Sequence, residues 1–215
     1  MTVPANSLVF AIDDDPSVRK ALTRMLRVAG YQSEIFESAS DFLKREQHTG
    51  ATCVIVDVRM PGIGGMDLQE SLIQHGREEQ LVFITGHGDI ATCAQAMKAG
   101  AVDFLSKPIR SDQLLQCVER ALVRSGEQRR QSAERHKVEQ LVSLLTSREY
   151  QVMQCVIKGM LNKQIAGELG TAEKTVKVHR GRMMRKLHVT SVVQLVRLIE
   201  GTSITLHPGY ETKVS

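Results

Sequence analysis

Over the first half of the chain, short apolar runs alternate with segments whose apolar residues recur at helical spacing. Three runs are wholly apolar, Leu8–Ile12, Cys53–Val56 and Leu81–Ile84, and two weaker ones lie at Gln32–Phe36 and Val102–Leu105. Strands that are covered on both faces have continuous apolar sequences, and the helices between them supply the covering layers. The alternation therefore predicts an α/β doubly wound sheet of five parallel strands with right-handed crossovers.

The second half of the chain has a different pattern. Residues 125–142 are charged and polar, and we expect them to form a largely helical linker. An apolar stripe that starts at Val138 either joins this linker to the following segment or pairs with another chain. Beyond the linker the spacing predicts helices only, at about 146–158, 162–169, 173–187 and 190–200. We therefore expect four parts: a first domain at 1–124, the linker, a small all-α domain at 143–203, and a flexible tail at 204–215.

Charge and composition indicate the kind of partner and the cellular location of the protein. Residues 1–124 carry 13 basic and 16 acidic side chains, whereas residues 125–215 carry 15 basic and 8 acidic ones, which favours a polyanionic partner for the second domain. No run approaches the roughly 20 apolar residues of a membrane span. Met1–Ser7 lacks the pattern of a secretory signal, and the four cysteines are scattered. We expect a cytoplasmic protein with no membrane partner.

Polar side chains stand at the carboxyl ends of four predicted strands. Asp13 and Asp14 follow the first strand, and Asp57 follows the third. Thr85 ends the fourth strand, and Lys107 follows the fifth. Ligand sites of open parallel sheets lie at this edge, so we expect these side chains to lie close together. A single Asp after a strand is usually a turn residue, but the combination of all five favours a functional site.

Three carboxylates at one edge repel each other unless a cation is present. Mg²⁺ accepts carboxylate oxygens and keeps open positions, which suits Asp14 and Asp57 as ligands with Asp13 orienting them. A phosphoryl group bound there is open to attack by the Asp57 carboxylate, which gives an aspartyl phosphate. The ammonium of Lys107 and the hydroxyl of Thr85 then stabilise further phosphoryl oxygens.

Four phrases in the first domain carry a resemblance to a known family: IDDDPSVRKAL, VIVDVRMPG, FITGHGD and AMKAGAVDFLSKP. They resemble the flavodoxin-like receiver domain of bacterial two-component response regulators, and in particular the FixJ branch of the NarL/FixJ family, over residues 8–122. The resemblance implies that Asp57 is the phosphoacceptor. It also implies that Asp13 and Asp14 bind Mg²⁺ together with the backbone carbonyl of Arg59.

The same resemblance implies roles for three residues near the phosphoacceptor. Thr85 is the switch hydroxyl, and Lys107 is the lysine of the family that contacts the phosphoryl group. Phe104 is the aromatic side chain that changes rotamer together with Thr85. From the residues alone, Phe104 is equally well an ordinary core aromatic.

The segment 162–187 has the pattern of a helix-turn-helix. A short helix is followed by Gly170, which allows a tight turn, and then by a longer helix. On the longer helix an apolar face that includes Val176, Met183 and Leu187 lies opposite a basic face. A basic amphipathic helix alone is often a solvated surface or lies on a membrane. The preceding helix and turn favour the major groove of DNA instead.

The phrases LTSRE, NKQIAGELG and KTVKVHR are similar to the LuxR-type helix-turn-helix of the same NarL/FixJ family, over about 143–200. The resemblance implies that Lys177 and Val178 face the bases. It implies phosphate contacts from Lys163, Thr175, Arg182 and Arg185.

The two resemblances together imply a transcription factor controlled by phosphorylation, most simply an activator. A sensor histidine kinase phosphorylates Asp57, and the face at about 90–122 then favours a homodimer that binds double-stranded DNA. RNA polymerase is a further candidate partner. Such a chain phosphorylates itself from a donor and loses the group slowly, without being a turnover enzyme. Two alternatives stay open: a Mg²⁺-dependent phosphohydrolase with Asp57 as nucleophile, and a receiver that controls a protein-binding output.

Overall fold

The computed structural model describes residues 4–86 and 90–201. The chain divides into two compact units, Met1–Arg130 and Gln131–Ser215. The division falls inside the segment 125–142 that the sequence identifies as a linker. The predicted tail at 204–215 lies outside the described residues.

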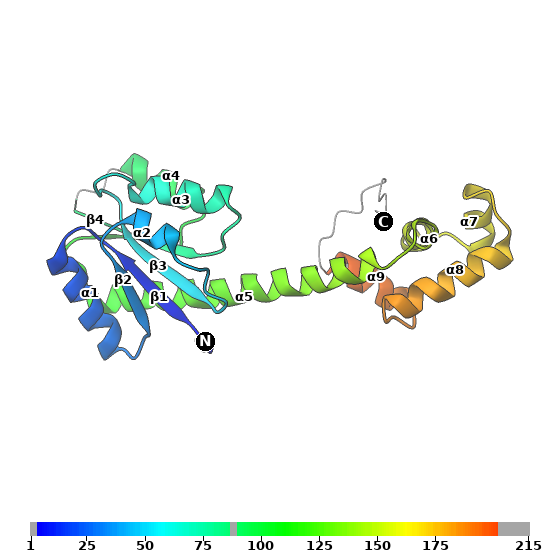
Figure 1. Cartoon of the computed structure of the whole chain (residues 1–215), viewed down its shortest axis with the longest axis horizontal. Coiled ribbons are helices and arrows are strands. Elements are labelled where there is room, and N and C mark those ends of the chain that lie inside the picture. Colours follow the sequence, from blue (N-terminus) through cyan, green and yellow to red (C-terminus); the bar gives the residue numbers. More distant parts are fainter. Residues whose placement is uncertain (1–3, 87–89, 202–215) are drawn as a thin grey trace. The chain divides into compact units, whose positions relative to one another are not determined.

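The first unit contains the predicted parallel sheet (Figure 1). Its strands pair in the order β2-β1-β3-β4-β5, and every pairing is parallel. This is the flavodoxin-like order, with the change of direction at β1 and β3. The strands are β1 (Leu8–Ile12), β2 (Ser33–Phe36), β3 (Thr52–Asp57), β4 (Gln80–Thr85) and β5 (Asp103–Ser106).

Helices cover both faces of the sheet. Alternate residues of β1, β3 and β4 pack on one side against α1 (Pro16–Val28) and the first part of α5 (Ser111–Ser143). The other side packs against α2 (Ala39–Lys44), α3 (Gly65–Gln74) and α4 (Ile90–Lys98). Because the central strands are buried on both faces, their sequences are apolar runs without alternation.

A buried ionic cluster lies before β4, at the edge of the sheet opposite the predicted site. Glu79 is 6% exposed and accepts hydrogen bonds from Arg45, 2.7 Å from Nη2, and from Arg77, 3.0 Å from Nε. Burial opposes the negative charge, but the two guanidinium groups outweigh it and hold the pKa of Glu79 below its ordinary value. The Arg45 guanidinium also lies 3.8 Å from the centre of the Phe10 ring. These contacts tie the loops before β3 and β4 to the core.

Helix α5 continues through the predicted linker. Within the first unit, the Ser125 hydroxyl accepts a hydrogen bond from the backbone N–H of Thr52 at 2.9 Å. Within the second unit, Val138 and Val142 are buried in its hydrophobic core. The apolar stripe therefore packs against the helical segment that follows it, which is one of the two alternatives the sequence leaves open.

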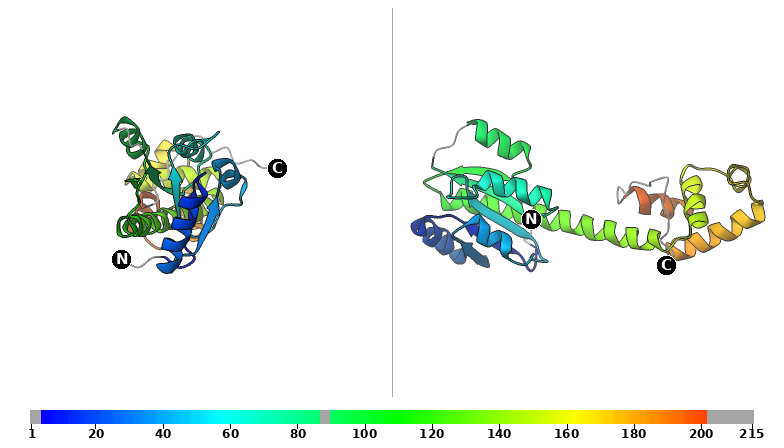
Figure 2. Two further views of the ribbon diagram at one scale, coloured as in Figure 1. Left: turned by 90° about the vertical axis from the view of Figure 1, so that its left-hand side faces the viewer. Right: turned by 45° about the horizontal axis from the view of Figure 1, so that its top comes forward.

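In its described residues the second unit consists of helices joined by short loops, with no strand (Figure 2). After the end of α5 it contains α6 (Ser147–Ile157), α7 (Asn162–Glu168), α8 (Glu173–Lys186) and α9 (Val192–Glu200). All four lie within about two residues of their predicted bounds. Their shared core is aliphatic, with Tyr150 as its aromatic member. Among the described residues no helix has both the length and the apolar character that crossing a membrane requires.

Candidate functional site

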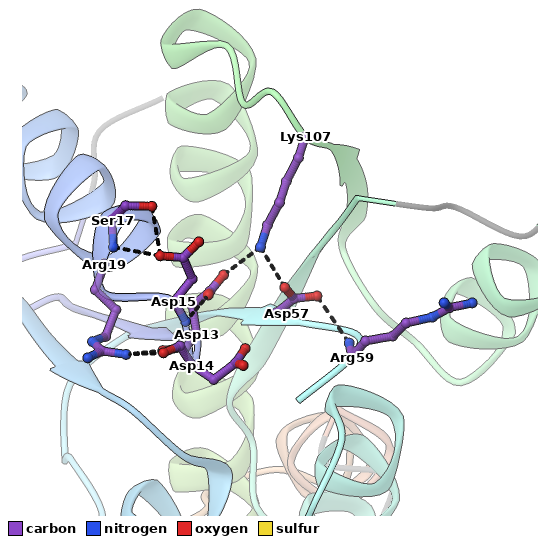
Figure 3. A network of polar contacts seen from close by, with 8 residues as sticks. All are labelled: Asp13, Asp14, Asp15, Ser17, Arg19, Asp57, Arg59 and Lys107. Atoms are coloured by element: carbon purple, nitrogen blue, oxygen red, sulfur yellow. Dashed lines mark hydrogen bonds and ion pairs between the residues drawn. The ribbon is translucent and has the colours of Figure 1, made fainter. Parts of the chain in front are cut away.

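Three carboxylates meet at the carboxyl edge of the sheet (Figure 3). Asp13 and Asp14 follow β1, and Asp57 is the last residue of β3, the strand paired with β1. Each offers one oxygen such that all three oxygens lie within 4.8 Å of one another. Asp13 is fully buried and Asp57 is 7% exposed, whereas Asp14 is exposed. The parallel register thus brings together residues that are more than forty positions apart in the sequence.

Lys107 bridges two of these carboxylates. Its Nζ donates to Asp57 Oδ2 at 2.6 Å and to Asp13 Oδ2 at 2.8 Å. Its backbone N–H donates to the carbonyl of Thr85 at 2.7 Å, which fixes the start of the side chain beside β4. Burial works against the ammonium, but the hydrogen bonds that it donates to the two carboxylates raise the pKa of Lys107. Lys107 is therefore a fixed positive charge at the centre of the site.

Burial also acts on the carboxylates. It raises the pKa of Asp13, although Lys107 and the backbone N–H of Asp15 act in the opposite direction. Among the described residues the Asp14 carboxylate has no hydrogen-bond or ion-pair partner. One ammonium thus lies beside three carboxylates and contacts two of them, Asp13 and Asp57. An all-oxygen donor set with excess negative charge suits a hard divalent cation such as Mg²⁺.

The other predicted residues surround this cluster in different ways. The Arg59 backbone N–H donates to Asp57 Oδ1 at 3.0 Å, and its side chain is exposed and extends away from the carboxylates (Figure 3). Thr85 ends β4 and is 1% exposed. Phe104 is half-buried, with its ring centre 6.1 Å from that of Phe83. The structure therefore places Phe104 against the core beside β4, where a core role and a switch role are both compatible with its contacts.

One residue of this network was not identified from the sequence. Arg19 of α1 donates from Nη1 to the backbone carbonyls of Asp13 and Asp14, both at 2.8 Å (Figure 3). Helical spacing gives no indication of this contact, because it depends on how the loop between β1 and α1 turns. Asp15 caps α1 by accepting from the backbone N–H of Ser17 at 2.7 Å.

The second unit contains a helix-turn-helix formed by α7 and α8. Gly170 has a φ of +60° between the two helices, a backbone conformation that favours glycine. Val176, Met183 and Leu187 are at most 1% exposed and form the buried face of α8 and its C-cap. The residues that the sequence assigns to DNA contact are all exposed: Lys163 on α7, and Thr175, Lys177, Val178, Arg182 and Arg185 on α8.

Helix α8 is held in place by polar contacts near its middle and at its C-terminus. Near its C-terminus, Lys186 Nζ donates to Glu149 Oε2 at 2.6 Å and to the Leu144 carbonyl at 2.9 Å. Glu149 is 2% exposed and also accepts from the Thr146 backbone N–H, which completes a capping box at the start of α6. Near its middle, Arg180 donates to the Asn162 side chain at the start of α7. These contacts fix the direction in which the basic face points.

We expect Glu149→Gln to lower the free energy of unfolding of the second unit by about 1–3 kcal/mol at pH 7. The reason is that the buried ion pair with Lys186 is lost. Burial opposes the charge of Glu149, but Lys186 and Thr146 lower its pKa below the ordinary 4.5. A depressed folded-state pKa stabilises the protein above the unfolded-state value, and this stability is lost as the pH falls through the folded-state value. The difference between wild type and variant should therefore disappear well below pH 4.5.

Native-state hydrogen exchange in α6 and α8, read by mass spectrometry, measures this difference at each pH. Glu168→Gln removes an exposed carboxylate from the same unit and is the matched control. Equal protection of wild type and Glu149→Gln at pH 7 would show that the ion pair does not stabilise the unit.

Comparison with known protein families matches each unit separately. Residues 9–119 match the model of the response regulator receiver domain. Residues 143–199 match the model of the luxR family of bacterial regulatory proteins. The first match spans the sheet and the carboxylate cluster, and the second spans the four helices of the second unit.

Individual relatives align with almost the whole chain. Nodulation protein W of Bradyrhizobium diazoefficiens is 39% identical over 97% of this chain and 92% of its own length. The transcriptional regulatory protein FixJ of Azorhizobium caulinodans is 38% identical over 91% of this chain and 93% of its own. The solved structure of the response regulator StyR superimposes with a TM-score of 0.79 at 48% identity, covering 91% of this chain and 99% of that one.

Proposed function

Because the chain belongs to the NarL/FixJ family of response regulators, and is thus a DNA-binding regulator of transcription, we propose that phosphorylation of Asp57 controls its binding to DNA. The observation that carries the proposal is the cluster of Asp13, Asp14 and Asp57 around Lys107. This cluster lies in the same chain as a helix-turn-helix whose basic face is exposed. The proposal links the two sites.

The phosphoryl transfer uses Asp57 as the nucleophile. A carboxylate oxygen of Asp57 forms a bond to phosphorus while the bond from phosphorus to the donor's leaving group breaks, and the leaving group keeps that electron pair. The Lys107 ammonium is already within hydrogen-bond distance of Asp57 and neutralises part of the charge on the phosphoryl oxygens. The Thr85 hydroxyl donates to another of these oxygens. The chain takes up one group and loses it slowly by hydrolysis.

The carboxylates hold a Mg²⁺ ion in this proposal. Asp13, Asp14 and Asp57 supply side-chain oxygens, and Arg59 supplies its backbone carbonyl. The Arg59 backbone is kept near Asp57 by its N–H bond to Oδ1, which supports this assignment. When bound, Mg²⁺ neutralises negative charge on the carboxylates and on the incoming phosphoryl group.

The new charge acts on the face formed by α4, β5 and α5. Thr85 turns toward the phosphoryl group, and Phe104 moves into the space that is left beside β4. Two observations support this movement. Phe104 is only half-buried, and the backbone of Thr85 is hydrogen-bonded to that of Lys107. The face then favours a homodimer, and two copies of α8 related by a two-fold axis read a near-palindromic site.

On DNA, the exposed face of α8 enters the major groove. Lys177 and Val178 face the bases, and phosphate contacts come from Lys163, Thr175, Arg182 and Arg185. The exposure of all six side chains and the burial of the opposite face support this assignment. The phosphoryl donor is a sensor histidine kinase, the protein acts in the cytoplasm, and RNA polymerase is a candidate partner of the activated dimer.

Size-exclusion chromatography with light scattering tests the coupling. Wild-type protein treated with Mg²⁺ and acetyl phosphate should shift from the mass of a monomer to that of a dimer. Asp57→Asn should stay monomeric under the same treatment. An unchanged mass for a fully phosphorylated wild type would rule out control by dimerisation.

A further inference from the structure

Arg19 ties down the loop that carries the two acidic residues after β1. A single nitrogen of its guanidinium, Nη1, donates to the carbonyls of both Asp13 and Asp14 at 2.8 Å. Only 21% of the side chain is exposed, and its other contact, to Glu37, is a distant one at 4.0 Å. The hydrogen bonds of the Arg19 side chain thus go to backbone carbonyls of the loop and not to a carboxylate.

The two acidic residues of this loop are oriented in different ways. The Asp13 carboxylate has its own fixed partners, because Oδ1 accepts from the Asp15 backbone N–H at 2.9 Å and Oδ2 accepts from Lys107. The Asp14 carboxylate is exposed and has no such partner among the described residues. The point from which the Asp14 side chain starts is therefore set by the backbone alone, and Arg19 holds the carbonyl of that same residue.

We propose that Arg19 is a positioning residue that fixes Asp14 for binding Mg²⁺. Groups that orient a metal ligand without touching the metal typically change metal affinity about 10–100-fold when they are removed. Arg19 does this through the backbone, by fixing the two peptide groups on either side of the Asp14 Cα, from which the Asp14 side chain projects. The inference rests on the proposed function, since it assumes that this cluster binds Mg²⁺.

A simple effect of charge predicts the opposite result. Arg19 carries a positive charge near a site for a cation, so charge repulsion alone makes Mg²⁺ bind more weakly when Arg19 is present. Replacing Arg19 with an uncharged side chain would then tighten Mg²⁺ binding. If Arg19 positions Asp14, the same replacement weakens binding. The sign of the change separates the two explanations.

Isothermal titration calorimetry with MgCl₂ on the full chain measures this sign. Arg19→Met should raise the dissociation constant about tenfold or more. Arg19→Lys should recover part of the loss, because a shorter side chain with one ammonium can still donate to a carbonyl. Arg24→Met removes an exposed arginine from the same helix and should leave the affinity unchanged.

Thermal unfolding separates positioning from a general loss of structure. In Mg²⁺-free buffer Arg19→Met should unfold close to the wild-type temperature, whereas the rise in unfolding temperature on adding Mg²⁺ should shrink. An affinity equal to or tighter than that of wild type would overturn the positioning role. If wild type binds Mg²⁺ and takes up a phosphoryl group, that result leaves the proposed function standing. If wild type does neither, both proposals fail.

Discussion

Asp57→Asn should gain no mass when it is incubated with Mg²⁺ and acetyl phosphate, whereas wild type should gain one phosphoryl group. The amide lacks the negative oxygen that attacks phosphorus, and it no longer forms a charged pair with Lys107. Asp13 does not replace it, because Asp13 is fully buried and bonded to both Asp15 and Lys107. Intact-mass spectrometry reads the result directly.

Asp112→Asn is a suitable control, since it removes an exposed carboxylate at the start of α5 and should be phosphorylated like wild type. Omitting Mg²⁺ should abolish the mass gain of the wild type. A phosphoryl group on Asp57→Asn would identify another acceptor and contradict the account. Steady release of phosphate over many turnovers would instead support the phosphohydrolase alternative.

Replacing Lys177 and Arg182 together by alanine should weaken DNA binding by at least about 1–3 kcal/mol, which is about fivefold or more, because the loss of a contact with a base alone costs about this much. Both side chains are exposed on α8, so neither supports the core of the unit. Within the described part of the chain, Lys177 pairs only with Glu173, at 3.3 Å on the surface, and the stability lost there is small. The loss of affinity is measured by fluorescence anisotropy, with a DNA duplex that has been selected from random sequences for binding to the wild-type protein.

The control removes the same number of charges from other surfaces of the unit. Lys158 follows α6 and Arg197 lies on α9, and both are exposed. The control pair should lower the affinity far less, whereas the α8 pair should also reduce the salt dependence of binding. Equal effects of the two pairs would mean that net charge, and not the basic face of α8, drives binding. No effect of either would favour a protein-binding output.

Much of the fold follows from local patterns in the sequence. The three central strands were predictable because burial on both faces demands apolar runs such as Leu81–Ile84, whereas the partly buried β2 and β5 gave weaker patterns. The length of α5 was harder to predict, because its residues are polar on average and its middle part has no apolar stripe. Its C-terminal part is helical because Val138 and Val142 pack into the second core, which is a tertiary effect.

The candidate site was predictable where topology determines it. Parallel strands bring Asp13, Asp57 and Lys107 to one edge whatever the details of the loops. Contacts that depend on loop shape were not predictable: Arg19 reaches two carbonyls, and Glu79 lies between two arginines from different loops. The spacing of Thr146 and Glu149 indicates a capping box, but nothing in the sequence indicates that Lys186 also contacts Glu149.

The central claim is that the phosphoryl group on Asp57 changes the affinity of the chain for DNA. The most direct test titrates a selected duplex with phosphorylated and unphosphorylated wild-type protein at one salt concentration, with Asp57→Asn beside them. A coupling of about 1–3 kcal/mol predicts that the phosphorylated form binds about 5- to 150-fold more tightly. Asp57→Asn should bind equally with and without the donor. Equal affinity of the two wild-type forms, with phosphorylation verified by mass, would contradict the account.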